Sequence, residues 1–381
     1  MRIISKNFIE KEIQNTGFSP DYVSIGANKH KFLNIKIFAL RALEANILKQ
    51  TALSCDCDCA VHRRSIDCKV EKTDCILSGT ISQLIEVSKK LRKQPLTLPG
   101  LSDEILNMII YSKKTAKTQI MGILNLTQDS FSDGGEFYNF DKAVRHIEEM
   151  IKDGAQIIDA GAESTRPGAN KTQEIQKEIE KLLPVVKYVK ENHPQILVSI
   201  DTRNSKTARE TLNAGADIIN DVSGLRYDSE MAKTVAEFGA HLVIMHSRST
   251  PEDMDKMCEY KNLVDEVYIE LERQYEYAVN EGVKVQNIII DPGFGFAKNY
   301  EQNIELLLRI EEFKSLGARV LAGVSRKRFL RQLSNTQNPK EADNITAFTS
   351  AYFASKGIDI IRVHNVAKTA EALRFGNIFT Q

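Results

Sequence analysis

Two groups of polar residues in the second part of the sequence have side chains suited to chemistry on a small molecule. In the first group, Asp201, Asn220 and Asp291 each lie at the end of a short apolar run. Carboxylates and an amide offer acceptors and a donor to a flat heterocycle, and a carboxylate that faces an amino–imino edge makes paired, charge-assisted hydrogen bonds. This group therefore predicts a site for a heterocycle that is rich in N–H groups.

The second group is neutral to cationic. It comprises Asn125, Arg166, Arg362 and His364, with Lys327 nearby. Glycine-rich loops accompany these residues, and glycine lets backbone N–H groups approach an anion closely. The group therefore suits a phosphate-rich anion.

Each of these residues has a plainer interpretation when it is taken alone. A carboxylate at a strand end, such as Asp201 or Asp221, most often caps the next helix. A lone histidine such as His364 is more often structural than catalytic. Their joint placement at the ends of successive strands favours a shared site instead.

The elements that must position these residues alternate regularly from about Gln119 onward. Short apolar runs are each followed by an amphipathic helical stretch. The runs are QIMGILNL, QIIDAGA, ILVSID, ADIINDV, HLVIMH, NIIIDPG, RVLAGVS and DIIRVH. A doubly wound parallel sheet would show the same alternation, but eight near-equal units favour a (β/α)8 TIM barrel, an α/β fold in which the polar strand ends meet at one rim.

Residues 1–116 do not share this alternation. FLNIKIFAL and TDCILSGT indicate strands, and RALEANILKQTAL and ISQLIEVSKKLRKQ indicate helices. LTLPG and the polar SKKTAKT indicate the connection to the barrel. We therefore expect a small α/β domain of unknown role over residues 1–116, before a barrel domain over residues 117–381.

Composition is that of an ordinary globular protein. Apolar residues make up 42% of the chain and charged residues 27%, and Lys+Arg and Asp+Glu balance at 51 each. This balance gives no reason to expect a nucleic-acid or membrane surface. Neither a signal-peptide pattern nor a run of about eighteen apolar residues is present in the sequence, so we expect a cytoplasmic location.

Most of the cysteines lie close together in the first domain, within and after the stretch SCDCDCAVH. They are Cys55, Cys57, Cys59, Cys68 and Cys75. With His62 they could hold zinc or an iron–sulfur cluster, yet the C-x2-C pairs of structural zinc sites are missing. Free Cys is a small hydrophobe, so CDCDC also fits one short edge strand with its thiols inward. We favour this structural interpretation and keep metal binding as the alternative.

The motifs around the polar residues resemble those of dihydropteroate synthases, enzymes of the pterin-binding barrel superfamily. The motifs lie in order, one barrel unit apart, from about Gln119 to the C-terminus. They are NLTQDSFSDGG, GAESTRPGA, SIDT, IIND, IDPGFGF, GVSRK and RVHN. The resemblance implies a transferase of folate biosynthesis, in which para-aminobenzoate displaces diphosphate from (7,8-dihydropterin-6-yl)methyl diphosphate to give 7,8-dihydropteroate.

The resemblance also implies a role for each matching residue. The catalytic residues would be Asn125, Arg166, Lys327, Arg362 and His364. The pterin would contact Asp201, Asn220, Met245, Asp291 and Lys327. The diphosphate would contact Asn125, Thr165, Arg166, Arg362 and His364. The para-aminobenzoate would contact Phe131, Thr165, Pro167, Phe296 and Ser325. Mg2+ would bind the diphosphate and Asn125.

Departures from the family pattern are modest, and none falls on a residue with an implied chemical role. They are Gln128, Ala162, Ser249, Ala297 and Asn365. Methyltransferase domains that bind methyltetrahydrofolate also hold a pterin, but they need no diphosphate-binding residues. A catalytically silent pterin-binding protein is the other alternative, and it too would not need the diphosphate-binding residues that this sequence contains. Since the family is typically dimeric, we expect a homodimer.

Overall fold

The computed structural model describes the whole chain except residues 5, 114–116, 127–139, 163–170, 249–257 and 381. The chain forms two compact units, Met1–Lys114 and Thr115–Gln381. The boundary expected between residues 116 and 117 lies close to this division.

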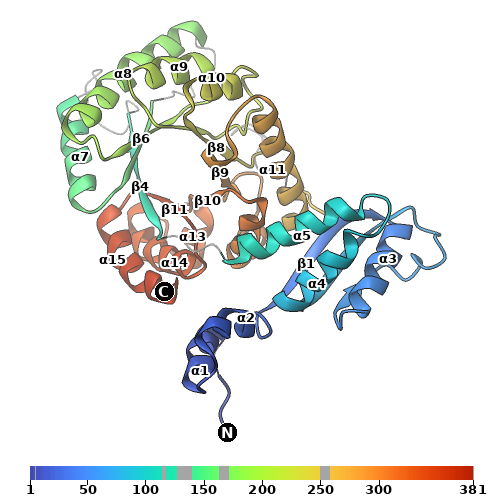
Figure 1. Cartoon of the computed structure of the whole chain (residues 1–381). Helices are drawn as coiled ribbons and strands as arrows, with labels where there is room; N and C mark the ends of the chain where they lie inside the picture. Colours follow the sequence, from blue (N-terminus) through green and yellow to red (C-terminus); the bar gives the residue numbers. More distant parts are fainter. Residues whose placement is uncertain (5, 114–116, 127–139, 163–170, 249–257, 381) are drawn as a thin grey trace. The chain divides into compact units, whose positions relative to one another are not determined.

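In the second unit, parallel strands close into a barrel, which confirms the predicted (β/α)8 fold (Figure 1). The order around the barrel is β10-β11-β4-β5-β6-β7-β8-β9, so strands that follow one another in sequence are neighbours in space. The strands are β4 Gln119–Asn125, β5 Ile157–Gly161, β6 Leu197–Asp201, β7 Ile218–Asp221, β8 His241–Met245, β9 Ile288–Asp291, β10 Arg319–Ala322 and β11 Ile360–Val363.

Helices surround the barrel (Figure 1). The α-helices are α7 Phe140–Lys152, α8 Lys171–Asn192, α9 Ser205–Asn213, α10 Met231–Phe238, α11 Leu263–Asn280, α12 Tyr300–Leu308, α13 Arg328–Leu333, α14 Asp343–Ser355 and α15 Val366–Gly376. The 3-10 helices are η4 Val285–Asn287, η5 Ile310–Leu316, η6 Pro339–Ala342 and η7 Asn377–Thr380. Apolar residues repeat at helical spacing on the inner faces; α7, for example, buries Ala143, Ile147 and Met150 against the strands. Within the described parts of the chain, no helix is long and apolar enough to cross a membrane.

An apolar layer fills the lumen of the barrel, and each strand contributes one residue to it. The layer consists of Met121, Ile157, Leu197, Ile218, Val243, Ile289, Leu321 and Ile360. Side chains alternate along a strand, so the residue two positions further on faces the lumen again, nearer the carboxyl end. Those residues are Ile123, Asp159, Ser199, Asn220, Met245, Asp291, Gly323 and Arg362. The lumen therefore changes from apolar to polar towards the rim where the strands end.

The first unit contains an antiparallel sheet with the order β1-β3-β2. Its strands are β1 Phe32–Arg41, β2 Asp58–Ala60 and β3 Lys72–Thr80. Its α-helices are α1 Ile9–Asn15, α2 Val23–Ala27, α3 Ala42–Leu53, α4 Ile81–Leu91 and α5 Leu98–Lys113, and its 3-10 helices are η1 Lys6–Phe8 and η2 Pro20–Tyr22. β1, β3, α3 and α4 fall on the segments that the sequence pattern indicates.

One segment of the first unit differs from expectation. LTLPG was expected to connect the two domains, but α5 begins at Leu98 and includes the Pro and Gly of this motif. Proline is tolerated in the first turn of a helix because the N–H groups there have no intrahelical partner. Leu98, Leu101, Ile105 and Ile109 are buried and recur every three or four residues, so packing outweighs the turn signal.

The cysteines of the first unit mostly belong to its core. Cys57, Cys59 and Cys75 are buried with the leucines of α3 and α4. β2 is an edge strand, as expected, but it includes only the last two residues of CDCDC, because Cys55 and Asp56 lie in the turn after α3. Across the described residues, no group of three or more His, Cys, Asp and Glu side chains could hold a metal ion. Burial is the largest influence on the Cys57 thiol and raises its pKa to about 11, so this thiol stays protonated at neutral pH.

Candidate active site at the carboxyl ends of the barrel strands

Arg362 of β11 connects two carboxylates in the polar part of the lumen. Its Nε donates to Asp159 Oδ2 at 2.6 Å, and its Nη2 donates to Asp201 Oδ2 at 2.6 Å. Burial opposes the charge of Arg362, but the two carboxylates outweigh burial and raise the pKa of the guanidinium. Asp201 belongs to the group expected to bind a heterocycle and Arg362 to the group expected to bind an anion, so the two groups meet in this ion pair.

Asp159 of β5 organises the polar lumen. Its side chain is fully buried, and besides Arg362 it accepts from Ser199 Oγ at 2.5 Å and from Asn220 Nδ2 at 3.3 and 3.4 Å. A buried carboxylate is costly unless such partners surround it. Because Asn220 directs Nδ2 at Asp159, its Oδ1 remains as the acceptor for a ligand.

Asp291 and Lys327 form a second corner of the site. Asp291 ends β9, and its Oδ1 accepts from the backbone N–H of Gly293 at 2.8 Å. Burial raises the pKa of Asp291, against the opposing effect of the Lys327 charge. Burial also lowers the pKa of Lys327 to about 8, against the opposing effect of Asp291. Lys327 donates to Phe294 O, and its Nζ lies 4.5 Å from the centroid of the Phe296 ring.

Ser325 and His364 form a third, neutral corner. Ser325 Oγ accepts from the backbone N–H of His364 at 3.2 Å and lies 3.0 Å from His364 Nδ1. If the hydroxyl proton points at Nδ1, the imidazole carries its own proton on Nε2 and can donate it to a ligand. Burial, followed by the charges of Arg326 and Arg362, lowers the pKa of His364 to about 4, so the ring is neutral at pH 7.

The remaining candidate residues divide into two sets. Asn125 is exposed at the end of β4, and Met245 is buried at the end of β8. The others lie outside the described residues: Phe131, Thr165, Arg166 and Pro167. The pattern departures Gln128 and Ser249 also lie outside them. Asn365 caps α15, with its Oδ1 accepting from Lys368 N at 3.1 Å.

Sequence reasoning missed Asp159, which lies inside the apolar run QIIDAGA rather than at its end. The alternation of side chains along the strands would have found it. Asp159 lies two residues after the apolar lumen residue of its strand, as do Asn220 and Arg362 in theirs. Sequence reasoning also missed Lys298, a buried residue in the loop that follows β9. The glycines of this loop had drawn attention instead.

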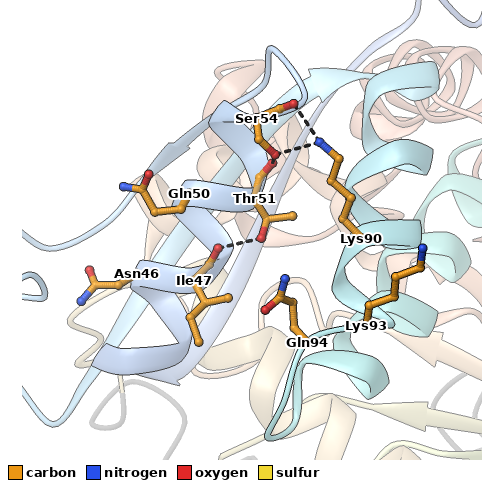
Figure 2. A pocket seen from close by; sticks show the side chains of 8 residues that line it. All are labelled: Asn46, Ile47, Gln50, Thr51, Ser54, Lys90, Lys93 and Gln94. Carbon is orange, nitrogen blue, oxygen red and sulfur yellow. Dashed lines mark hydrogen bonds between the residues drawn. The ribbon is translucent and has the colours of Figure 1, made fainter.

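A groove between α3 and α4 of the first unit offers a second concave surface (Figure 2), with a volume of about 520 Å³. Its lining residues are Asn46, Ile47, Gln50, Thr51, Ser54, Lys90, Lys93 and Gln94. Lys90 Nζ donates to Ser54 O and Ser54 Oγ, both at 2.9 Å, and Thr51 Oγ1 donates to Ile47 O at 2.8 Å. The Lys90 hydrogen bonds join α4 to the end of α3, whereas the Thr51 hydrogen bond lies within α3. The lining residues include no carboxylate, imidazole or thiol for acid–base or nucleophilic work.

Residues 121–364 match the sequence family described as pterin binding enzyme. The chain is 41% identical over 265 residues to a dihydropteroate synthase of Clostridium beijerinckii, a match that covers 70% of this chain and 95% of that protein. A crystal structure of the Clostridium difficile dihydropteroate synthase in the presence of pteroic acid superposes with a TM-score of 0.63 at 39% identity, covering 70% of this chain and 98% of that one.

A longer match reaches beyond the barrel. The chain is 36% identical over 355 residues to a probable bifunctional folylpolyglutamate synthase/dihydropteroate synthase of Haloferax volcanii, and this match covers 87% of the chain but 41% of that protein. A match of this length must include part of the first unit. A segment similar to the first unit therefore also occurs in that larger protein.

Proposed function

The chain belongs to the dihydropteroate synthases of the pterin binding enzyme family, transferases of the folate pathway, and we propose that its carboxyl-end rim carries out the reaction with the residues described above. In this reaction the amine nitrogen of para-aminobenzoate forms a bond to the methylene carbon of (7,8-dihydropterin-6-yl)methyl diphosphate. The bond from that carbon to the diphosphate oxygen breaks, and the amine loses a proton.

The observation that carries the proposal is the ion pair between Arg362 and Asp201. It places a heterocycle-binding acceptor and an anion-binding donor side by side, as a substrate that joins a pterin to a diphosphate requires. Asp201 and Arg362 remain partly exposed, whereas Asp159 is fully buried. In the proposal, Arg362 Nε keeps its hydrogen bond to Asp159 when the substrate binds. Arg362 Nη2 releases Asp201 and donates to a diphosphate oxygen instead.

The pterin ring then occupies the polar part of the lumen. Asp201 and Asp291 accept from its N–H groups, and Asn220 Oδ1 accepts a further hydrogen bond because its Nδ2 is committed to Asp159. Lys327 donates to the ring from the side, and Met245 lines the slot. The buried position of Asn220 and Asp291 supports this assignment, because hydrogen bonds to a ligand are strongest where water is absent.

The leaving diphosphate gathers negative charge as its C–O bond breaks. Arg362 supplies a fixed positive charge, and neutral His364 donates a hydrogen bond through Nε2. Groups held in place before the reaction stabilise developing charge without reorganisation. Thr165 and Arg166 complete this set in the proposal. The aniline nitrogen is already neutral at pH 7, so no activated side-chain nucleophile is required.

The described residues of this rim fit Mg2+ that arrives together with the substrate. Asn125 presents one exposed amide at the end of β4, and the described residues hold no cluster of three metal-ligating side chains. Mg2+ is commonly bound by one or two protein oxygens plus substrate phosphates and water. Asn125 would hold the ion, and Mg2+ would neutralise charge on the diphosphate.

The para-aminobenzoate site is proposed next to the loop that follows β9. Phe296 is half-buried beside Lys327 and offers an aromatic face, and Ser325, shortly after the end of β10, is proposed to lie near the carboxylate of the amine substrate. Phe131, Thr165 and Pro167 are proposed to complete the site. Loops that exclude water and hold the amine in line would supply most of the remaining acceleration.

We also propose a cytoplasmic homodimer. Phe348 on α14, Phe375 on α15 and Ile378 on η7 are 71%, 62% and 61% exposed, and α14 packs against both α15 and η7. A cluster of exposed apolar residues of this kind marks an interaction surface. Sedimentation velocity should give a dimer for the wild type and a monomer for Phe348→Glu; a wild-type monomer contradicts this part of the proposal.

The reaction itself is tested by following diphosphate release and dihydropteroate formation by the full chain. We expect both products in equal amounts, and only when the pterin diphosphate, para-aminobenzoate and Mg2+ are all present. Binding of the pterin diphosphate without either product would contradict the proposed reaction and would indicate a catalytically silent pterin-binding protein.

A further inference from the structure

The loop that follows β9 has an unusual backbone conformation. Gly293, Gly295 and Ala297 have φ values of +71°, +76° and +50°. The left-handed region costs little for glycine but roughly 1–2 kcal/mol for a residue with a side chain such as Ala297. A loop with alternate residues in this region needs external contacts to keep one conformation.

Side chains supply those contacts by binding the backbone of the loop. Lys298 Nζ donates to Gly293 O at 3.0 Å and to Phe296 O at 3.1 Å. Asn303 Oδ1 accepts from Gly295 N at 2.7 Å, and Tyr260 donates to Ala297 O at 3.0 Å. Of these partners, Lys298 alone joins both ends of the loop.

Lys298 is 7% exposed, and no carboxylate lies within ion-pair distance of it in the described part of the chain. Its third partner is His246 Nδ1 at 3.0 Å. An ammonium group has three donors, and the three acceptors around Lys298 match them in number. The match requires a neutral His246, and burial, followed by the Lys298 charge, lowers the pKa of His246 to about 3. Burial also lowers the pKa of Lys298 to about 7, so the ammonium form with its three donors predominates only below that pH.

His246 ties this arrangement to the outer helix α11. Its Nε2 lies 3.2 Å from Glu270 Oε2, and Arg248 donates to Glu270 Oε1 from Nε at 2.9 Å and from Nη2 at 2.6 Å. Arg226 donates to Glu270 Oε2 at 3.0 Å. The loop is thus connected through buried His246 to a partly exposed cluster of charged residues on and around α11, with an ion-pair distance rather than a hydrogen bond between His246 and Glu270.

We propose that Lys298 is a positioning residue, which holds the loop of residues 292–297 so that Phe296 faces the amine substrate and Phe294 O faces Lys327. Asp201, Asn220 and Asp291 lie on strands whose ladder does not involve Lys298. The loop contacts Lys327 through Phe294 O and Asp291 through Gly293 N, so loss of Lys298 reaches the pterin only through these two contacts. It reaches the amine substrate directly, through Phe296, and we therefore expect the larger effect on the amine. This inference rests on the proposed function, in which Phe296 contacts para-aminobenzoate.

The test uses the full-length Lys298→Met variant, which keeps the length of the side chain but removes its donors. Steady-state diphosphate release should show a KM for para-aminobenzoate raised about tenfold or more, while the dissociation constant of the pterin diphosphate changes less than threefold. Hydrogen exchange of residues 292–297, measured without substrate, should become faster. Lys298→Arg, which keeps donors at this position, should recover part of both effects.

Lys190→Met is the matched control. Lys190 also donates to a backbone carbonyl, Ile196 O at 3.2 Å, and to Asp217 Oδ2 at 2.5 Å, but at the amino end of the strands. Its loss should lower stability and leave both substrate constants unchanged. If Lys298→Met does not fold, Glu270→Gln weakens the same chain of contacts from its outer end and should raise the KM for para-aminobenzoate by a smaller factor.

Unchanged loop exchange, an unchanged KM for the amine, or an equal loss of affinity for both substrates would each overturn the positioning role. Failure of the proposed function looks different. In that case the wild type forms no dihydropteroate, while loop exchange still responds to Lys298→Met.

Discussion

The barrel lumen and the core of the first unit both bury a carboxylate beside an arginine, but they use the pair differently. In the first unit, Glu44 accepts two hydrogen bonds from Arg41, at 2.9 and 2.8 Å, and two from Thr97, through its backbone N–H at 3.1 Å and its hydroxyl at 2.6 Å. Every partner belongs to a neighbouring element of the same unit. These contacts fix β1, α3 and the start of α5, and both carboxylate oxygens have partners within the unit.

In the barrel, Arg362 is shared between a fully buried Asp159 and a partly exposed Asp201. In the proposed function, the Asp159 half of this arrangement stays in place and the Asp201 half exchanges with an anion. A buried charge is costly to keep, and the proposal assigns this cost to ligand binding rather than to folding. The comparison suggests a criterion: an arginine with a partly exposed carboxylate partner is a candidate for ligand binding, whereas an arginine whose carboxylate partner is buried is structural.

The largest effect on turnover is expected when the barrel pair is broken, and a variant that breaks the pair of the first unit serves as its comparison. Arg362→Ala removes the charge that faces the leaving diphosphate, and we expect kcat to fall roughly 100- to 1000-fold. Arg41→Ala breaks the corresponding pair in the first unit and should lower stability while kcat and both KM values stay within about twofold of wild type. Steady-state diphosphate release measures both; equal effects of the two variants would remove the distinction.

Asp159→Asn tests the buried partner of the barrel ion pair. Arg362 and Asn220 lose the carboxylate that orients them, and we expect kcat/KM for the pterin diphosphate to fall about 10- to 100-fold. Asp221→Asn is the control, because Asp221 is also buried at a strand end but accepts from Ser223 and Leu225 instead. A kinetic loss that is as large in Asp221→Asn would mean that any buried carboxylate near the rim has this effect.

Lys327 gives the site a pH dependence that the first unit should lack. Burial chiefly lowers its pKa to about 8, so the ammonium form that donates to the pterin is lost as the pH rises through 8. We expect the KM for the pterin diphosphate to rise up to about tenfold per pH unit above that value. Lys327→Arg should stay charged and abolish this rise. A profile that is the same in both proteins would exclude Lys327 as its source.

Glu44 should show the opposite pattern, with an effect on stability and none on turnover. The hydrogen bond from Arg41 is the largest influence and lowers the pKa of Glu44 from 4.5 to about 2. A carboxylate with a depressed pKa stabilises the fold above its unfolded pKa, and this contribution is lost as the pH falls from about 4.5 towards 2. Glu44→Gln should lower Tm at pH 7 by about 5 °C and flatten the acid dependence, with kinetics unchanged. Altered kinetics would link the first unit to the reaction.

The smallest effect is expected in the groove of the first unit. Replacing both Lys90 and Lys93 with Ala removes its positive charge (Figure 2), and kcat and both KM values should stay within about twofold of wild type. A larger change in any of these constants would show that the groove communicates with the rim.

The sequence predicted the barrel and most of the rim for a local reason. Eight apolar runs alternate with helices, and a parallel barrel brings every strand end to one rim, so Asp201, Asn220 and Arg362 could be placed together without coordinates. The sequence did not reveal residues whose roles depend on contact partners far away in the chain. Asp159 binds Arg362, which is 203 residues away in the sequence. Lys298 contacts His246, which is 52 residues away. In α5, a local Pro–Gly turn signal was outweighed by core packing.

The most direct test is a crystal structure of the full chain with the pterin diphosphate bound and para-aminobenzoate absent. The expected result is a pterin between Asp201, Asn220 and Asp291, with Arg362 Nε still on Asp159 and Nη2 moved from Asp201 to a diphosphate oxygen. A ligand bound elsewhere, or one bound in the lumen while the Arg362–Asp201 pair stays intact, would contradict the account.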